Sequence, residues 1–391
     1  MKRMRKILWA GVTGIFLAWA AHAAEIDHVH KVTLMRVPGG GIQPQVAVDT
    51  TGTVHMVYYK GDPGHGDLYY VRSRNSDATF STPLRVNTTP ESAVAAGNIR
   101  GAHIAIGRNG RVHVAWNGSH SLILGAAYGK EPMLYARLND AGTAFEPQRN
   151  LIQVAYGLDG GGSVAADSTG NVYVVWHAPA PGTEGEGNRR VWMARSTDDG
   201  ATFERERPVW DHPTGACGCC GLKAFADRSG ALYVLYRSAT EVVHRDIYLL
   251  ISRDRGRTFE GTDISKWNVG ACVMSSESFA ETSLGVLAAW ETEKQAYYGR
   301  VDPASGRMSP PVGAPGTGAN RKFPTVAGNA EGETLFAWTE GMGWKKGGSL
   351  AWQIYDKSGK PTAEQGKVDG VPVWSLVAAF SRRDGGFTVV Y

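Results

Sequence analysis

The chain has 391 residues, of which 50 are glycine, 12 are tryptophan and 20% are charged. With 42% hydrophobic residues it can bury a sizeable core, which excludes a wholly disordered chain. Many glycines and tryptophans with few charges also argue against a coiled coil or a helical bundle.

The N-terminal segment has the pattern of an export signal. Four basic residues precede the apolar run 7–20, and an A-x-A cleavage site follows at Ala21-His22-Ala23. We therefore expect a signal peptide over residues 1–23 and a periplasmic or secreted mature chain over residues 24–391. An uncleaved membrane anchor is the alternative, but the apolar run is short for a membrane span.

Removal of this signal leaves 37 basic and 37 acidic residues in the mature chain. A net charge of zero does not favour nucleic acid or an anionic membrane surface as a partner. No later apolar run is long enough to span a bilayer.

The rest of the chain is built on one repeat. A short apolar strand, a glycine turn and a second strand ending in Trp or Tyr recur seven times. The turn glycines are Gly52, Gly110, Gly170, Gly230, Gly285, Gly332 and Gly385. A third strand follows most copies and a weaker fourth follows some. Units of about 50 residues with four strands are typical of β-propeller blades, so we expect one all-β domain over residues 24–391.

The two ends of the repeat predict how the ring closes. The seventh hairpin ends at the C-terminus without a third strand, and the segment 31–37 precedes the first hairpin without a blade of its own. Pairing the two segments would remove two exposed sheet edges. This favours seven blades; six blades with an odd terminal hairpin is the alternative.

Two turns after third strands share the pattern S-x-D-x-G-x-T-F. The residues are Ser196, Asp198, Gly200, Thr202 and Phe203 in one copy and Ser252, Asp254, Gly256, Thr258 and Phe259 in the other. Asp and Ser side chains bond turn amides, Gly takes a positive φ, and Phe fills the gap between sheets. This motif resembles the Asp-box, or BNR repeat, of the sialidase superfamily over nearly all of the mature chain. The resemblance implies that these residues are structural and that a ligand binds at the opposite rim of the channel.

At that opposite rim the first strands begin and the second strands end. The residues there carry charges of both signs around a channel mouth, which is a plausible ligand site. The candidate ligand-binding residues are Gln43, Arg100, Asp159, Arg237, Arg321 and Trp374.

Sialidases bind the substrate carboxylate with three arginines and use a Tyr–Glu pair as nucleophile. By this resemblance Arg100, Arg237 and Arg321 form a carboxylate clamp, because guanidinium groups bond carboxylates in a bidentate manner. Glu277 with Tyr298 is the candidate catalytic pair. Gln43 stands where the family has its first arginine, and this departure argues against hydrolysis.

The four cysteines of the chain are Cys217, Cys219, Cys220 and Cys272. The register of the repeat brings all four to the same rim. An even number of cysteines in an exported protein indicates disulfides, and we expect one or two bonds from the C-x-C-C loop to itself and to Cys272. The alternative is a copper or zinc site that includes Met274, since clustered thiolates suit soft metals. His28 and His30, near the mature N-terminus, are further candidates for copper.

Three functions therefore stay open for this propeller. It binds a glycan or similar small molecule at the rim without hydrolysing it, or it is an exo-sialidase-type glycoside hydrolase. The third is a non-enzymatic propeller that binds copper or an exported protein partner through its cysteine cluster. The sequence alone does not establish whether the chain is an enzyme.

Overall fold

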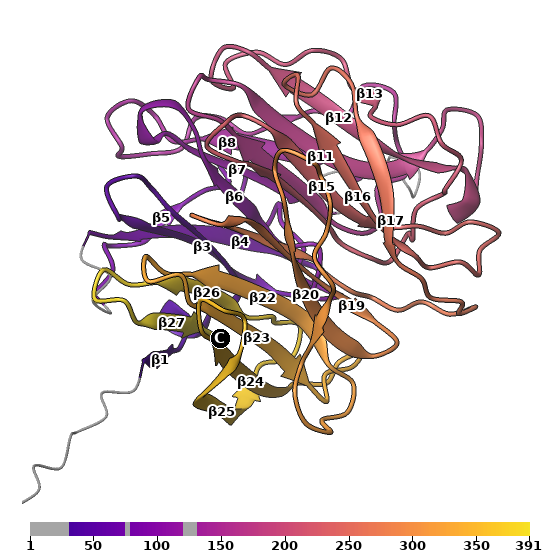
Figure 1. The fold of residues 1–391 in the computed structure, drawn as a ribbon. Helices are drawn as coiled ribbons and strands as arrows, with labels where there is room; N and C mark the ends of the chain where they lie inside the picture. The colour runs from indigo at the N-terminus through magenta and orange to yellow at the C-terminus, as the bar shows by residue number, and fades with distance from the viewer. Residues whose placement is uncertain (1–30, 75–78, 120–130) are drawn as a thin grey trace, which may run out of the picture. The chain divides into compact units, whose positions relative to one another are not determined.

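The structure is a computed structural model and describes residues 31–74, 79–119 and 131–391. These residues form seven small sheets, the blades of a β-propeller, as the repeat predicts (Figure 1). The expected signal peptide, His28 and His30 lie outside the described residues. Within the described part of the chain, no helix has the length and apolar character needed to cross a membrane.

Six blades are four-stranded antiparallel sheets in which consecutive strands are neighbours. Blade 1 holds β2 (Ile42–Val48), β3 (Val54–Asp62), β4 (His65–Ser73) and β5 (Leu84–Arg85); blade 2 holds β6 (His103–Ile106), β7 (Val112–Asn117), β8 (Met133–Arg137) and β9 (Arg149–Asn150); blade 3 holds β10 (Gly162–Ala166), β11 (Val172–Pro179), β12 (Arg189–Ser196) and β13 (Arg207–Pro208). Blade 4 holds β14 (Leu222–Ala226), β15 (Leu232–Arg237), β16 (Ile247–Ser252) and β17 (Glu260–Ser265); blade 5 holds β18 (Ser278–Thr282), β19 (Gly285–Thr292), β20 (Gln295–Val301) and β21 (Val312–Gly313); blade 6 holds β22 (Lys322–Gly328), β23 (Thr334–Glu340), β24 (Gly348–Tyr355) and β25 (Pro361–Val371). Short 3₁₀ turns lie at Pro38–Gly40, Arg108–Gly110 and Glu186–Asn188.

The seventh blade joins the two ends of the described chain. β26 (Ala378–Ser381) pairs antiparallel with β27 (Phe387–Val390), and β1 (Val32–Met35) pairs with β27 in parallel. In Figure 1 the indigo β1 lies beside this C-terminal hairpin. The predicted closure of the ring is therefore confirmed, and with it the choice of seven blades over six.

The hydrophobic core is divided among the seven interfaces between adjacent blades. One cluster, for example, packs Val57 and Leu68 of blade 1 against Val114 and Trp116 of blade 2. The aromatic residue that ends the second strand of each repeat is buried in these interfaces; Trp116, Trp176 and Trp290 are fully buried. The recurring Trp or Tyr of the sequence is thus what fills the gap between one blade and the next.

Both Asp-box turns are held by the same hydrogen bonds. Asp198 accepts bonds from the hydroxyl of Ser196 (2.7 Å), from the Thr202 amide (2.8 Å) and from the Thr202 hydroxyl (2.6 Å). Gly200 lies at a φ of 77°, a left-handed conformation that glycine adopts without strain. Phe203 meets Tyr135 of the preceding blade edge to face, with 4.8 Å between the ring centroids. Each Asp-box therefore stabilises its own turn through hydrogen bonds and also packs against the preceding blade.

We expect Asp198→Ala to lower the free energy of unfolding by about 1 kcal/mol at neutral pH, because the turn loses its central acceptor. Burial opposes ionisation of Asp198, but the bonds from Thr202 and Ser196 outweigh it and lower the pKa of this carboxyl to about 2. A lowered pKa stabilises the folded state above the unfolded value of 3.8, so the difference between wild type and variant should shrink as the pH falls from about 4 to 2.

Urea unfolding of wild type and variant at pH 7 and pH 2.5 measures both effects. Asp211→Ala is the control, because Asp211 is exposed and has no hydrogen bond or ion pair within the described residues. Equal midpoints for Asp198→Ala and wild type at pH 7 would show that the box does not stabilise the fold.

Candidate functional site at the start of the first strands

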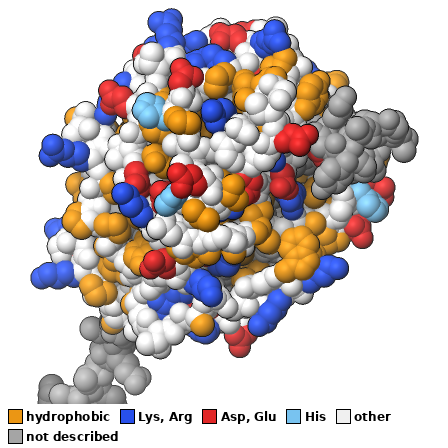
Figure 2. Space-filling view, turned by 90° about the vertical axis from the view of Figure 1, so that its right-hand side faces the viewer, with side chains coloured by type: hydrophobic (Ala, Val, Ile, Leu, Met, Phe, Trp, Pro, Cys, Tyr) orange, Lys and Arg blue, Asp and Glu red, His pale blue; other side chains and the backbone are white. Residues whose placement is uncertain are grey.

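A cavity of about 1000 Å³, lined by both apolar and polar groups, runs between the first strands of all seven blades. The repeat glycine lies in the turn after the first strand of a blade, and the Asp-box lies in the turn after the third strand. Because the first and third strands run in the same direction, both turns lie on one rim of this channel. We call the other rim, where β2, β6, β10, β14, β18, β22 and β26 begin, the start rim. The face in Figure 2 carries interspersed acidic and basic side chains, with no broad field of one sign.

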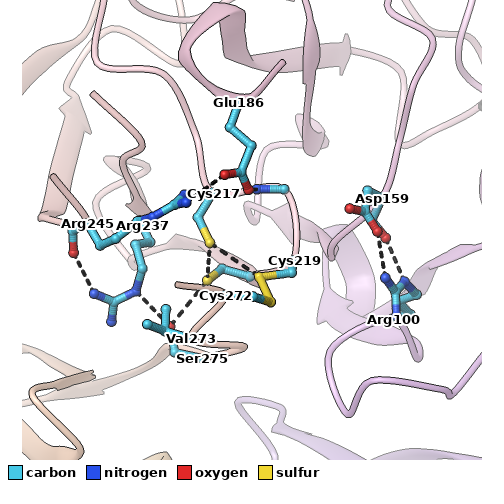
Figure 3. The surroundings of a disulfide bond; sticks show 12 residues. Arg100, Asp159, Glu186, Cys217, Cys219, Arg237, Arg245, Cys272, Val273 and Ser275 are labelled. Carbon is cyan, nitrogen blue, oxygen red and sulfur yellow. Dashed lines mark hydrogen bonds and ion pairs between the residues drawn. A yellow bond between two sulfur atoms is a disulfide. The ribbon is translucent and has the colours of Figure 1, made fainter. Parts of the chain in front are cut away.

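The C-x-C-C loop is fixed at the start rim just before β14 (Figure 3). Glu186 of blade 3 bonds the Gly218 amide (2.5 Å) with one carboxylate oxygen and Arg245 of blade 4 (2.6 Å) with the other. The Cys217 amide donates to the Arg237 carbonyl at 2.9 Å, and the Cys220 carbonyl accepts from the Gly161 amide. Blades 3 and 4 therefore hold the loop together.

The loop is also joined covalently to the fifth repeat. Cys219 forms a disulfide with Cys272, with 6.3 Å between their Cα atoms. This confirms the expected bond from the loop to Cys272. Cys272 is exposed, Cys219 is half-buried, and Cys217 and Cys220 are buried free thiols.

The two free thiols are in close contact. Their sulfur atoms lie 2.6 Å apart, and the Cys217 sulfur is also 3.6 Å from the sulfur of Cys219. Burial opposes ionisation of Cys220, but the Cys217 thiol, Arg237 and Ser275 favour its thiolate and lower its pKa below the usual value. The pKa of Cys217 is raised, first because its thiol donates to Cys220 and then by burial.

Two buried carboxylates lie in the electrostatic environment of Cys220. Glu277 is 6% exposed and Glu291 is 0% exposed, and none of their carboxylate oxygens has a hydrogen-bond partner among the described residues. Lys322 lies 3.7 Å from Glu291. Burial raises the pKa of Glu277 well above its usual value and that of Glu291 to about 7. Met274, on the same segment as Cys272, is half-buried and has a positive φ of 48°.

The three predicted clamp arginines have no partner in common. The Arg100 guanidinium donates to the carboxylate (2.5 Å) and to the backbone carbonyl (2.7 Å) of Asp159. It also donates to the Ala96 carbonyl. Figure 3 places this pair apart from the cysteines. Arg237 is 1% exposed and donates to Ser275 and to the carbonyls of Arg245 and Glu291.

Arg321 is 2% exposed and is likewise occupied. It donates to Glu340 and Gln295, both at 3.1 Å, and to two backbone carbonyls. Arg237 and Arg321 thus use their guanidinium groups to fasten buried loops, while Arg100 is the most open of the three.

Gln43 and Trp374 connect blades 7, 1 and 2. The Gln43 amide nitrogen donates to the carbonyls of Ala95 (2.5 Å) and Trp374 (2.6 Å), and its oxygen accepts from the Gly101 amide. Trp374 is 8% exposed and meets Trp344 edge to face. Glutamine at this position therefore satisfies three backbone groups, which an arginine could not do because it has no acceptor.

Tyr298 lies in the core between blades 5 and 6. Its ring packs 5.0 Å from that of Phe336 and 5.3 Å from that of Tyr355, centroid to centroid, and burial raises its pKa. No hydrogen bond links it to Glu277, whose carboxylate has no partner in the described chain. The structure therefore does not bring the predicted Tyr–Glu pair together.

A lysine that the sequence analysis did not single out crosses the channel. The ammonium of Lys223 on β14 donates to Gln45 of β2 (2.9 Å) and lies 3.2 Å from Nδ1 of His103 on β6. Ser163 of β10 is 3.4 Å from the same His103 nitrogen. These four polar side chains form the channel layer of the site. The available signal was a lone lysine inside the apolar first strand Leu-Lys-Ala-Phe-Ala.

The positive charge of Lys223 has no carboxylate partner within the described residues. Burial alone lowers its pKa to about 8, and burial together with Lys223 lowers the pKa of His103 well below its usual value. Lys223 therefore keeps its charge at neutral pH beside neutral partners, in a cavity that is open to solvent.

Several residues at the start rim have a left-handed backbone conformation. Positive φ occurs at Gln43 (52°), Asn98 (67°), Met274 (48°), Phe323 (48°) and Trp374 (62°). Only Asn among these tolerates that region well, so the others cost about 1–3 kcal/mol each. Such strain concentrates at functional sites, which favours this rim over the opposite one.

Comparisons with known proteins agree on the fold. No family model matches the sequence, and no curated protein matches it. Among solved structures, a protein of unknown function from Dyadobacter fermentans is similar at a TM-score of 0.52 and 13% identity, covering 83% of this chain and 96% of that one. An alpha-L-arabinanase from Penicillium chrysogenum, solved with arabinobiose, is similar at a TM-score of 0.51 and 11% identity, covering 83% of this chain and 95% of that one. The Hadza microbial sialidase Hz136 is similar at a TM-score of 0.50 and 13% identity, covering 82% of this chain and 69% of that one. The resemblance to sialidases therefore holds at the level of the propeller fold.

We expect Glu291→Gln to stabilise the protein at pH 8 and to leave its stability nearly unchanged at pH 4.5. The pKa of Glu291 is raised to about 7, so the folded state holds a proton that the unfolded state has already released, and wild-type stability falls as the pH rises from about 4.5 through 7. A neutral amide removes this loss, which is at most about 3 kcal/mol for a shift of this size.

Thermal melts across this pH range, with Glu331→Gln in the exposed turn between β22 and β23 as a surface control, measure the difference. A variant less stable than wild type at pH 8 would mean that the ionised carboxylate is stabilised by Lys322, against the expectation.

Proposed function

We propose that this chain is an exported, non-hydrolytic propeller that binds a small acidic sugar at the start rim, with the sugar's carboxylate on Lys223. The observation that carries the proposal is the ammonium of Lys223 in the channel, bonded to Gln45 and His103 and without a carboxylate partner in the described chain. A carboxylate there would gain a charge-assisted bond in a site partly shielded from water.

The surroundings of Lys223 fit a sugar of this kind. The channel layer offers the Gln45 amide and the His103 imidazole, which both line the cavity, for the hydroxyl groups of a ligand. At the mouth, Trp344 is 60% exposed, and both it and Arg100 lie close to Gly97. An exposed indole beside an ion pair can pack on the apolar face of a sugar while the charged groups bond its hydroxyls.

Hydrolysis is the less favoured alternative. The sialidase resemblance calls for three arginines on one carboxylate, whereas Arg237 and Arg321 already bond buried protein groups. It also calls for a tyrosine beside a glutamate, whereas Tyr298 packs between blades. The two solved glycosidases are similar in fold at 11–13% identity, which does not carry their reactions over to this chain.

A soft metal at the cysteine cluster is the second candidate function. The sulfur atoms of Cys217, Cys219 and Cys220 all lie within 4.8 Å of one another. The disulfide leaves two thiols free, which suits two-coordinate Cu(I) better than tetrahedral Zn(II). Titration of the protein with Cu(I) in competition with a chromogenic chelator tests it; a stoichiometry near zero would remove copper from consideration.

The test of sugar binding uses a matched pair of monosaccharides, D-galacturonic acid and D-galactose, which differ by a carboxylate at one carbon. We expect the acid to bind at least ten-fold more tightly by calorimetry at pH 7. Lys223→Met should remove that preference, because one charge-assisted hydrogen bond is worth about 1.5–3 kcal/mol. Lys357→Met, on the opposite rim, is the control and should bind like wild type.

Equal affinities for the two sugars, an unchanged Lys223→Met, or no binding of the acid at millimolar concentration would each contradict the proposal. N-acetylneuraminic acid extends the series. Steady release of the fluorophore from a 4-methylumbelliferyl sialoside, beyond one equivalent of enzyme, would instead establish the hydrolase.

A further inference from the structure

The four cysteines lie as an outer pair and an inner pair that share one close contact. The outer pair is the disulfide between Cys219 and the exposed Cys272. The inner pair is Cys217 and Cys220, which are 0% and 1% exposed and have their sulfurs 2.6 Å apart. The two pairs meet where the Cys217 sulfur lies 3.6 Å from the sulfur of Cys219.

We propose that these four residues form a thiol–disulfide exchange centre, in which an oxidised pair at the surface passes its bond to the buried pair. None of the four cysteines belongs to the proposed sugar site. Disulfides exchange by attack of a thiolate on one sulfur, so an attacking thiol must lie against the bond it breaks. Cys217 has that position relative to Cys219.

The exchange has two balanced steps. In the first, Cys217 passes its proton to the neighbouring Cys220 thiolate and attacks the Cys219 sulfur, a Cys217–Cys219 bond forms, and Cys272 leaves as a thiolate that takes up the proton from Cys220. In the second, the Cys220 thiolate attacks the Cys217 sulfur, a Cys217–Cys220 bond forms, and Cys219 leaves. The proton of Cys217 ends on Cys272 and the negative charge of Cys220 ends on Cys219, so no net oxidation or reduction takes place.

The surface pair is then a dithiol that can react with other molecules. A small disulfide such as oxidised glutathione would re-form the Cys219–Cys272 bond and release two molecules of reduced glutathione. The loop is built to keep Cys220 reactive, because Arg237 donates to Ser275 (2.9 Å) and Ser275 in turn lies 3.8 Å from the Cys220 sulfur. Glu186 accepts from the Gly218 amide and the Ser275 carbonyl accepts from the Gly221 amide. The loop backbone is therefore held on both sides of Cys219 and Cys220, which fixes the positions of these cysteines.

The test maps disulfides in the full chain. The protein is equilibrated with glutathione buffers of graded redox potential in the presence of a metal chelator, quenched in acid and alkylated, and its disulfide-linked peptides are identified by mass spectrometry. Where one disulfide remains per chain, we expect both the Cys219–Cys272 and the Cys217–Cys220 isomers, each at a tenth or more of the total.

Two matched variants separate the steps. Cys220→Ser should stop the exchange after the first step, so that a Cys217–Cys219 bond accumulates and Cys272 is alkylated. Cys217→Ser removes the attacking sulfur and should retain the Cys219–Cys272 bond alone. Circular dichroism and thermal melts check that both variants fold, and the wild-type map decides the question if either does not.

The proposal is overturned if wild type shows only the Cys219–Cys272 bond at every potential, with Cys217 and Cys220 always free. It is also overturned if the inner bond forms only together with the outer one, with no one-disulfide isomer of the inner pair. In either case the cysteines are structural, whatever the outcome for the sugar site.

Discussion

The parallel pairing of β1 with β27 is the constraint on which the rest of the molecule depends. Each blade is too thin to bury its own faces, so the core exists only as interfaces between neighbouring blades, and an open ring would break one interface and expose both of its faces. The pairing is reinforced at both ends of β1, where Phe387 donates to the Lys31 carbonyl and Tyr391 to the Met35 carbonyl. Closing the ring brings seven first strands around one axis, and this convergence alone creates the channel that Lys223 crosses.

A closed ring also decides which charges are free to meet a ligand. The loops at the start rim contain many backbone groups that no strand pairs, and buried groups of that kind need partners. Arg237, Arg321 and Gln43 supply those partners, which is why residues that look like a carboxylate clamp in the sequence are occupied in the fold. Lys223 is different because it extends from a regular strand, where the backbone is already paired with β15, and its charge therefore remains available.

The repeat and its turns could be predicted from the sequence because they depend on local chemistry. Gly at each turn, Asp and Ser in the boxes and Trp or Tyr at the end of the second strand each have a role that is set within a few residues. The disulfide between Cys219 and Cys272 could be predicted for a related reason, because the register of the repeat places both cysteines at the same point of adjacent blades. The site was less predictable. Whether Glu277 meets Tyr298, or whether Arg321 is free, depends on which way each side chain turns at the rim, and the repeat does not encode this. Lys223 was missed because a single lysine in an apolar strand has no periodic signal.

The cysteine loop and the channel are linked by their place in the chain. Cys220 is followed by Gly221 and Leu222 and then by Lys223, so the loop that holds the thiols is also the anchor of the strand that carries the channel's unpaired charge. Its backbone is tied to blade 3 through the Gly161 amide and to the fifth repeat through the Ser275 carbonyl. His177 adds a bond from blade 3 to the Cys220 carbonyl, and a side chain at Gly160 would collide with that same carbonyl. Blade 3 and the fifth repeat therefore both pack against the backbone at Cys220 and Gly221. Because packed interiors transmit displacement rather than absorb it, the position of Lys223 in the channel depends on the same few contacts that set the spacing of the sulfur atoms.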